Sequence, residues 1–262
     1  MPTGNQNNWI WEPLSPGQRT RLGLLSIVIL IALWILLTWV PSVPPLFLPG
    51  PARVYAQLRQ GPPLARWIAD LGASNLRVLL GFAIAILISL PTGIAIGAVP
   101  RVNAFFSPVV EMMRYVPVPA LLPLCILWFG VAEAQKVLVI LLGTVFQLTV
   151  AIALAVQNVP KGFIETGLTL GLTRWKILIK IVFPAAAANI YDAVRVSFGW
   201  AWSYLVVAEI VGSSGIGYSL MASQRYLQTG LVFGGIAELA ALGWLSDWTF
   251  RRLRGTFLPW VQ

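Results

Sequence analysis

The chain contains a run of nineteen residues, 22–40, without a single charged side chain. A helix of that length covers about 29 Å, close to the ~30 Å of a bilayer's hydrocarbon core. Further apolar stretches follow, so that 58% of the 262 residues are hydrophobic and only 10% are charged. Soluble domains carry about 25% charged residues, and this chain has too few polar side chains to cover a globule in water. The sequence therefore predicts an all-α membrane protein.

The apolar stretches predict six transmembrane helices. Their approximate bounds are 22–40, 78–99, 107–129, 137–156, 190–211 and 231–250. Arg19 and Arg21 precede the first span, and Arg251, Arg252 and Arg254 follow the last one. The positive-inside rule then puts both termini in the cytoplasm. No small-residue cleavage site follows the first span, so we expect a retained helix rather than a cleaved signal peptide.

These spans divide the chain into five parts. We expect a cytoplasmic N-terminus (1–21), the first helix (22–40), an external connector with a short interfacial helix (41–75), a five-helix core (76–250) and a cytoplasmic C-terminus (251–262). Two spans of the core carry special residues. Gly93 and Gly97 have the spacing of a close-packing helix face, and three prolines between 117 and 123 predict that the third span is broken. Broken backbone is tolerated in lipid only beside protein or water, so we expect this span to border a cavity.

Several kinds of chemistry are absent from the sequence. There is no histidine and only one cysteine, Cys125, so histidine-based triads and internal disulfides are excluded. No Gly-x4-Gly-Lys-Ser/Thr segment occurs, so the chain lacks the phosphate-binding loop of a P-loop ATPase. The net charge of +9 is spread along the chain, which favours topology signals and lipid contacts over nucleic-acid binding. We expect no cofactor, no metal and no enzymatic activity of the chain itself.

A polar, cationic segment between the fourth and fifth spans carries a motif. It reads Glu165-Thr166-Gly167, three residues, Gly171, nine residues, and then Ile181-Val182-Phe183-Pro184. This spacing resembles the "EAA" loop of ABC-transporter permease subunits: Glu-Ala-Ala, three residues, Gly, nine residues, Ile-x-Leu-Pro. The chain departs from that pattern at Thr166, Gly167 and Phe183, which stay small or apolar apart from the Thr166 hydroxyl.

The resemblance extends over about residues 75–250. The stretches 122–130, 201–209 and 215–220 resemble the permease branch that serves nitrate, aliphatic sulfonates, taurine and bicarbonate. The resemblance implies a type I ABC importer permease fold (MetI-like). It also implies a homodimer with a second permease copy, two ATP-binding subunits that hold ATP and Mg, and an extracytoplasmic substrate-binding protein.

In that family the motif forms a short cytoplasmic helix that docks into the ATPase, so 160–184 is the expected coupling loop. We expect Gly167 and Gly171 to keep side chains off one face so that the partner approaches closely. We expect the leucines of 168–172 to fill a groove, and Pro184 to end the segment where the fifth span starts in a new direction. An amphipathic helix lying on the membrane is the competing interpretation. The expected ATPase-coupling residues are Glu165, Gly167, Gly171, Arg174, Ile181 and Pro184.

Ionisable side chains inside spans are costly and usually face the protein interior. Glu111 with Arg114, and Asp192 with Arg195, have the i,i+3 spacing of pairs on one helix face. They are either structural ion pairs or groups that help an anion through. Glu209 has no partner within a turn, and it either gates the path, meets the binding protein or pairs structurally. The candidates for a translocation path are Arg114, Gln147, Arg195, Ser203, Tyr204 and Glu209, with interhelical hydrogen bonds as the alternative role for the uncharged ones.

The predicted function is the permease subunit of an ATP-driven, binding-protein-dependent importer of a small oxyanion: an aliphatic sulfonate or taurine, nitrate, or bicarbonate. The predicted location is the bacterial plasma (inner) membrane. A secondary transporter coupled to an ion gradient remains the alternative, because such proteins also contain broken helices. A membrane-embedded enzyme is a third class, disfavoured by the lack of a base for a serine or cysteine nucleophile.

The turn 212–217 is expected to be a flexible external turn.

Overall fold

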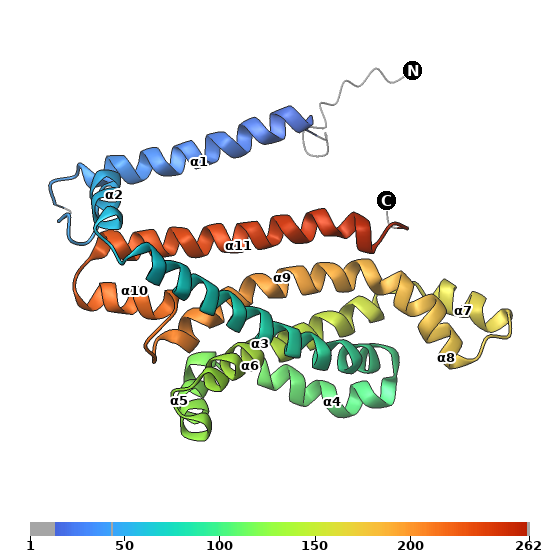
Figure 1. Ribbon diagram of the computed structural model, residues 1–262. Coiled ribbons are helices and arrows are strands. Elements are labelled where there is room, and N and C mark those ends of the chain that lie inside the picture. The colour runs from blue at the N-terminus through green and yellow to red at the C-terminus, as the bar shows by residue number, and fades with distance from the viewer. Residues whose placement is uncertain (1–13, 43, 261–262) are drawn as a thin grey trace, which may run out of the picture.

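The computed structural model describes residues 14–42 and 44–260, and every regular element in these ranges is a helix (Figure 1). The outer parts of both predicted terminal segments, 1–13 and 261–262, lie outside the described residues. The elements in chain order are α1 (Pro16–Thr38), α2 (Pro51–Arg59), α3 (Leu64–Ala98), α4 (Pro100–Met113), α5 (Val118–Phe129), α6 (Glu133–Gln157), α7 (Lys161–Thr169), α8 (Arg174–Ile177), the π-helical turn η1 (Leu178–Val182), α9 (Phe183–Glu209), α10 (Ile216–Arg225) and α11 (Thr229–Phe257).

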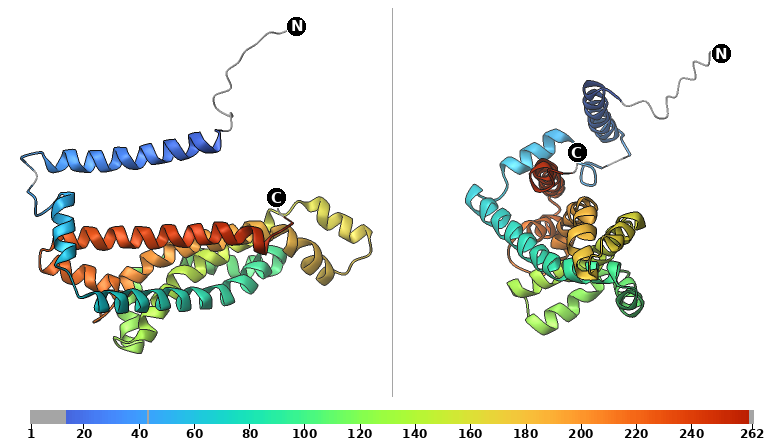
Figure 2. Two further views of the ribbon diagram at one scale, coloured as in Figure 1. Left: turned by 45° about the horizontal axis from the view of Figure 1, so that its top comes forward. Right: turned by 90° about the vertical axis from the view of Figure 1, so that its right-hand side faces the viewer.

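Five of these helices are long and apolar enough to cross a membrane, and α4 with α5 makes a sixth span if the bent pair is counted as one. The long helices run side by side (Figure 2). We call the end that carries α7 and α8 the loop end, and the opposite end, with α2 and α10, the α10 end (Figure 1). The described ends of α1 and α11 nearest the chain termini both lie toward the loop end.

The core of the bundle is the packing of α3, α6 and α9. A Cβ atom built on Gly93 would lie 2.8 Å from Cβ of Ile152, and one built on Gly97 would lie 2.7 Å from Cβ of Val156. Only glycine lets α3 approach α6 this closely, so the predicted close-packing role of Gly93 and Gly97 is confirmed. Apolar side chains of the three helices fill the space between them, with Leu148 of α6 fully buried among them.

The third span is broken, as the prolines predicted. Helices α4 and α5 meet at an angle of 93° around residues 114–117. Pro117 is the N-cap of α5, where its missing N–H costs nothing. The span also begins earlier than expected, because Pro100 at the first position of α4 starts the helix seven residues before Ser107.

Helix α1 lies at the edge of the bundle, and none of its apolar window is buried (Figure 1). The ring of Trp34 stacks on Phe233 of α11 at 5.9 Å between centroids. Helix α2, the interfacial helix that the connector was expected to contain, also packs on α11. The connector ends at Pro63 rather than at residue 75, because α3 already begins at Leu64. Residues 64–75 are helical because no proline interrupts them and because their polar side chains, such as Asp70, are paired inside the protein.

Candidate functional site

The segment 160–184 folds into a small helical unit that extends beyond the ends of the long helices (Figure 2). Helix α7 ends at Thr169, and Gly171 follows in the turn with a φ of +72°. The Leu172 N–H donates to the Gly167 carbonyl at 3.0 Å, and the Gly171 N–H donates to the Leu168 carbonyl at 3.0 Å. These two bonds form a Schellman motif. Gly171 is therefore required by the backbone of the turn. An added Cβ atom would meet nothing within 4 Å, so the expectation that Gly171 leaves room for a partner stays a prediction.

Gly167 also acts inside the chain. It is buried, and a Cβ atom built on it would lie 2.6 Å from Cδ1 of Ile181 and 3.1 Å from Cγ1 of Ile177. The glycine lets α7 lie directly on α8 and η1. The expectation that Gly167 leaves a bare face for another protein is corrected: its open face is occupied by Ile181, another residue of the predicted set.

The chain does not stop and restart at Pro184. Helix α8, η1 and α9 follow one another without a break, and the helical run Arg174–Glu209 is a single candidate span. Pro184 lies in the first turn of α9, directly after the π-helical turn. A π turn holds one more residue than an α turn, which removes the steric clash that a proline makes with the preceding turn. The segment therefore does not end at Pro184 as predicted, and a continuous helical run with one wide turn carries it into the fifth span.

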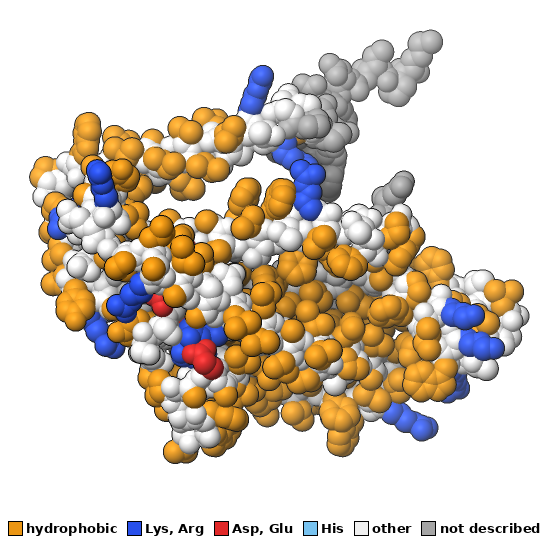
Figure 3. Space-filling view, in the orientation of Figure 1, with side chains coloured by type: hydrophobic (Ala, Val, Ile, Leu, Met, Phe, Trp, Pro, Cys, Tyr) orange, Lys and Arg blue, Asp and Glu red, His pale blue; other side chains and the backbone are white. Residues whose placement is uncertain are grey.

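The surface of this unit mixes large apolar and basic side chains. Phe163, Leu168, Leu170 and Trp175 are all exposed, and Trp175 keeps 73% of its surface accessible. Leu172, by contrast, packs against the core. Glu165 is exposed in the second turn of α7, and the cations of the unit are exposed as well: Lys161, Arg174, Lys176 and Lys180. Figure 3 shows Lys and Arg side chains at the loop end, beside the broad apolar surface of the spans. Exposed apolar residues among charges are typical of a protein-binding surface.

A cavity of about 370 Å³ lies where the third span is broken. The break between α4 and α5 forms one wall, and α6 and α9 form the others. Three predicted path residues, Arg114, Ser203 and Tyr204, line this cavity together with Trp200. The ring of Tyr204 fits against Gly143 of α6, where an added Cβ atom would lie 2.6 Å from Cγ of the tyrosine.

The other three path candidates lie elsewhere. Gln147 is half-buried on α6 and does not line this cavity. Arg195 belongs to an ion-pair cluster between α9 and α11: its Nε is 3.0 Å from Oδ1 of Asp247, and its Nη1 is 3.7 Å from Oδ1 of Asp192. The predicted Asp192–Arg195 pair is therefore confirmed. The predicted Glu111–Arg114 pair is not formed, since no ion pair found among the described residues involves either side chain.

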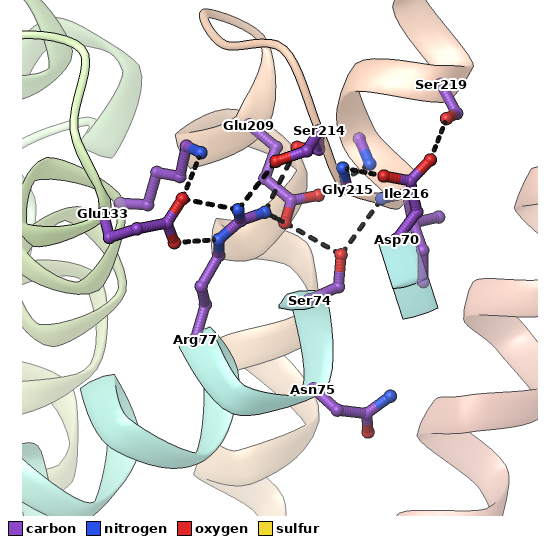
Figure 4. A network of polar contacts seen from close by, with 12 residues as sticks. Asp70, Ser74, Asn75, Arg77, Glu133, Glu209, Ser214, Gly215, Ile216 and Ser219 are labelled. Atoms are coloured by element: carbon purple, nitrogen blue, oxygen red, sulfur yellow. Dashed lines mark hydrogen bonds and ion pairs between the residues drawn. The ribbon is translucent and has the colours of Figure 1, made fainter. Parts of the chain in front are cut away.

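Glu209 belongs to a buried polar network at the α10 end (Figure 4). Arg77 of α3 donates from Nε and Nη2 to Glu133 at 2.5 and 2.6 Å, and from Nη1 to Glu209 at 2.5 Å. Lys136 donates to Glu133 at 2.8 Å. Glu209 has no exposed surface, so a direct role in gating or in meeting a partner does not fit its position. The geometry supports structural pairing, the third role that the sequence left open for Glu209.

The same network holds the start of α10. The backbone N–H groups of residues 215–217 donate in turn to Asp70 at 2.8 Å, to Ser74 at 3.0 Å and to Glu209 at 2.8 Å. The first N–H groups of a helix have no partner within the helix, and here side chains of α3 and α9 satisfy them. The turn 212–217 was expected to be flexible, but its last three residues are buried and fixed by these bonds.

Most of this network was not predicted from the sequence. Arg77 and Lys136 were not among the candidate residues, and Asp70 and Ser74 fell in the expected connector. A signal was present: Asp70, Ser74 and Arg77 are spaced i, i+4, i+7, which puts three polar side chains on one face of a helix.

Comparisons with known proteins agree with this architecture. A family model described as "Binding-protein-dependent transport system inner membrane component" matches residues 85–255. The taurine transport system permease protein TauC of Escherichia coli (strain K12) is 32% identical over 258 residues, which covers 96% of this chain and 93% of that protein. The putative aliphatic sulfonates transport permease protein SsuC of Bacillus subtilis (strain 168) is 34% identical over 239 residues, which covers 91% and 87% of the two chains.

A solved structure shares the fold. It is described as an inward-facing conformation of the MetNI methionine ABC transporter, and it superposes with a TM-score of 0.64 at 18% identity. The match covers 72% of this chain and 95% of that chain. Likeness at this level of identity concerns the fold alone, and it confirms the expected all-helical, MetI-like class.

Proposed function

Because this chain belongs to the family of binding-protein-dependent transport system inner membrane components, we propose that it carries a small organic sulfonate across the membrane. As a permease subunit of such an importer it is a transport component, not an enzyme, and the gradient-coupled transporter considered from the sequence is set aside. Taurine and aliphatic sulfonates are named for its relatives. The names of these relatives therefore favour a sulfonate over nitrate and bicarbonate, the other oxyanions expected from the sequence.

The observation that carries the coupling part of the proposal is the exposed surface of the segment 160–184. It combines Trp175, Leu168 and Leu170 with several cations on a unit that extends past the bundle. We propose that a separate ATPase subunit, which binds ATP and Mg, docks on this surface. The packing of Gly167 on Ile181 keeps α7, α8 and η1 together as one unit. Movement of the ATPase would therefore be transmitted along the continuous helix from Arg174 to Glu209.

The proposed assembly contains two permease copies, two ATP-binding subunits and an extracytoplasmic binding protein. The loop end would face the cytoplasm together with both termini, and the α10 end would face the binding protein. The unburied apolar window of α1 is consistent with contact to lipid or to the second copy. In this scheme ATP closes the two ATPases, and the helical bundles alternate between openings toward the two sides. Solute would pass near the cavity at the broken third span.

A pull-down with two matched aromatic substitutions tests the coupling surface. Trp175 is 73% exposed at the loop end, and Tyr226 is 77% exposed at the α10 end. We expect the wild type and Tyr226→Asp to co-purify an ATPase from native membranes, and Trp175→Asp and Glu165→Lys to lose it. Recovery of equal amounts of ATPase with all four chains would reject the docking surface.

The same purification tests the solute. The binding protein captured with the wild type is screened by calorimetry against taurine, methanesulfonate, nitrate and bicarbonate. The proposal expects binding of a sulfonate. A binding protein that takes nitrate or bicarbonate and no sulfonate would overturn the assignment of substrate while leaving the permease role in place.

A further inference from the structure

We propose that the cavity at the broken third span is an oxyanion subsite of the permease itself, with Arg114 as the cation that receives a sulfonate group. The identity of the solute rests on the proposed importer function. The subsite itself rests on the position of Arg114, on its lack of a counter-charge and on the unpaired hydroxyl groups that share its cavity.

Arg114 lies at the break of the third span, far along α4, and its side chain is exposed toward the cavity rather than packed in the core. It is the C-cap of α4, which begins at Pro100 and has 14 residues, so that Arg114 is about 20 Å along the helix from its start. The chain then leaves helical geometry over residues 114–117 before α5 begins. Such a break inside a membrane requires protein cover or water around its backbone. The cavity that borders residues 113–119 supplies a space for that water.

The charge of Arg114 is not neutralised within the described chain. An arginine inside a span normally pairs with an acid, as Arg77 does with Glu133 and Glu209 and as Arg195 does with Asp247. No carboxylate of the described residues lies within ion-pair distance of Arg114, and the cavity lining contains no acidic side chain. The site is therefore electropositive without a ligand.

Tyr115 orients the guanidinium. Nη2 of Arg114 donates to the Tyr115 hydroxyl at 2.7 Å, and Cζ lies 4.8 Å from the centre of the tyrosine ring. Among the hydrogen bonds of the described residues, none uses Nε or Nη1 of Arg114. Nε–H and Nη1–H each form a planar fork with one hydrogen of Nη2. The Tyr115 bond occupies one Nη2 hydrogen, so one of the two forks stays free to bind two oxygens of a carboxylate, phosphate or sulfonate.

The opposite wall offers further donors and an apolar surface. Ser203 and Tyr204 face the cavity from α9, and neither hydroxyl has a hydrogen-bond partner among the described residues, while many other hydroxyls of the spans bond to a carbonyl of their own helix. Trp200 and Phe146 complete the wall. One cation, two free hydroxyls and aromatic surface without any carboxylate match a small organic molecule that carries an oxyanion head group.

Cysteine chemistry tests the subsite without any partner protein. The full chain with Cys125→Ala and Ser203→Cys is placed in nanodiscs, where both membrane faces are open to reagents. Rates of labelling are compared for the anionic 2-sulfonatoethyl and the cationic 2-(trimethylammonium)ethyl methanethiosulfonates. We expect the ratio of anionic to cationic rate to fall roughly tenfold in Arg114→Gln, since a single charge at this range changes each rate severalfold.

Two further variants control this measurement. Arg101 is exposed in the first turn of the same helix and lies outside the cavity, so Arg101→Gln should leave the ratio unchanged. Arg114→Lys keeps the charge and should keep the ratio. Folding of Arg114→Gln is checked in a chain that retains Cys125, because this fully buried thiol stays unreactive in the native bundle. An equal ratio in folded Arg114→Gln and its parent would overturn the proposal.

Binding is measured by protection. Methanesulfonate should slow the labelling of the cysteine at 203, and dimethyl sulfone, which is similar in size but uncharged, should not. The protection should vanish in Arg114→Gln. Absence of protection by methanesulfonate in the parent also overturns the subsite. None of these labelling rates needs an ATPase or a binding protein. A negative labelling result would therefore reject the subsite alone, whereas failure of the importer assignment would be seen in the pull-down.

Discussion

Glu209 accepts hydrogen bonds from three sources although none of its surface is exposed. Arg77 and Ser74 donate to one carboxylate oxygen and the Gly217 N–H donates to the other. A buried carboxylate without partners would be strongly destabilising, but here each oxygen is used. The residue thus joins the ends of α3 and α9 to the first turn of α10. Glu209 lies where these helices meet, and that position does not make it part of a path for solute.

Glu209→Gln should therefore lower stability. The glutamine keeps the shape but loses the negative charge opposite Arg77, and its amide cannot accept both sets of bonds. We expect a loss of about 1–3 kcal/mol, measured as a lower midpoint of thermal unfolding for the purified protein. Glu111→Gln is the matched control, because Glu111 is exposed and has no ion pair among the described residues. Equal midpoints for the two variants would contradict the structural role of Glu209.

At the scale of elements, α7 depends on η1 and α8 for its position. Helix α7 has nine residues, and isolated helices of fewer than about 12 are marginal in water. Its stability comes from the contact of Gly167 with Ile177 and Ile181, and from the turn at Gly171. The π-helical turn then carries the unit into α9 without a break. Gly167 and Gly171 shape the unit itself, and the proposed docking surface is made by the exposed side chains around them.

Gly167→Leu should loosen α7 without affecting the spans. The added side chain has no room beside Ile181, whereas a Cβ atom at Gly162, in the same helix, meets nothing within 4 Å. We expect faster tryptic cleavage after Lys176 in Gly167→Leu than in the wild type, and wild-type rates in Gly162→Leu. Identical digestion of both variants would show that the packing of α7 on η1 does not hold the unit together.

At the scale of the whole molecule, charge is concentrated at the two ends of an apolar bundle (Figure 3). The described ends of α1 and α11, with Arg251, Arg252 and Arg254, lie toward the same end as the segment 160–184. The positive-inside rule therefore predicts that the loop end faces the cytoplasm. The network with Glu209 lies at the opposite end, which this prediction places near the extracytoplasmic surface.

Single cysteines report this orientation. In a Cys125→Ala chain, a membrane-impermeant maleimide added to intact cells should label Ser213→Cys, which lies in the exposed loop before α10. Thr173→Cys and Thr256→Cys are also at exposed positions, and they should react only after the membrane is permeabilised. Labelling of the cysteine at 173 in intact cells would reverse the assigned sides.

The sequence by itself determined the spans, the break and the position of the segment 160–184. Each of these depends on neighbours in the chain: the length of an apolar run, the spacing of prolines between 117 and 123, or a motif with fixed offsets. Span bounds shifted where local signals were weak. The start of α3 was missed because its polar face is paired with distant residues rather than with water.

Only the tertiary structure decided which side chains meet. Arg77 and Glu209 are 132 positions apart, and the walls of the Arg114 cavity come from four helices. A sequence lists polar residues in spans, but pairing, burial and access depend on which helix faces turn toward each other. That is why three predicted path residues share one cavity while Gln147, Arg195 and Glu209 lie outside it. It is also why Gly167 of the motif packs against Ile181 of its own chain.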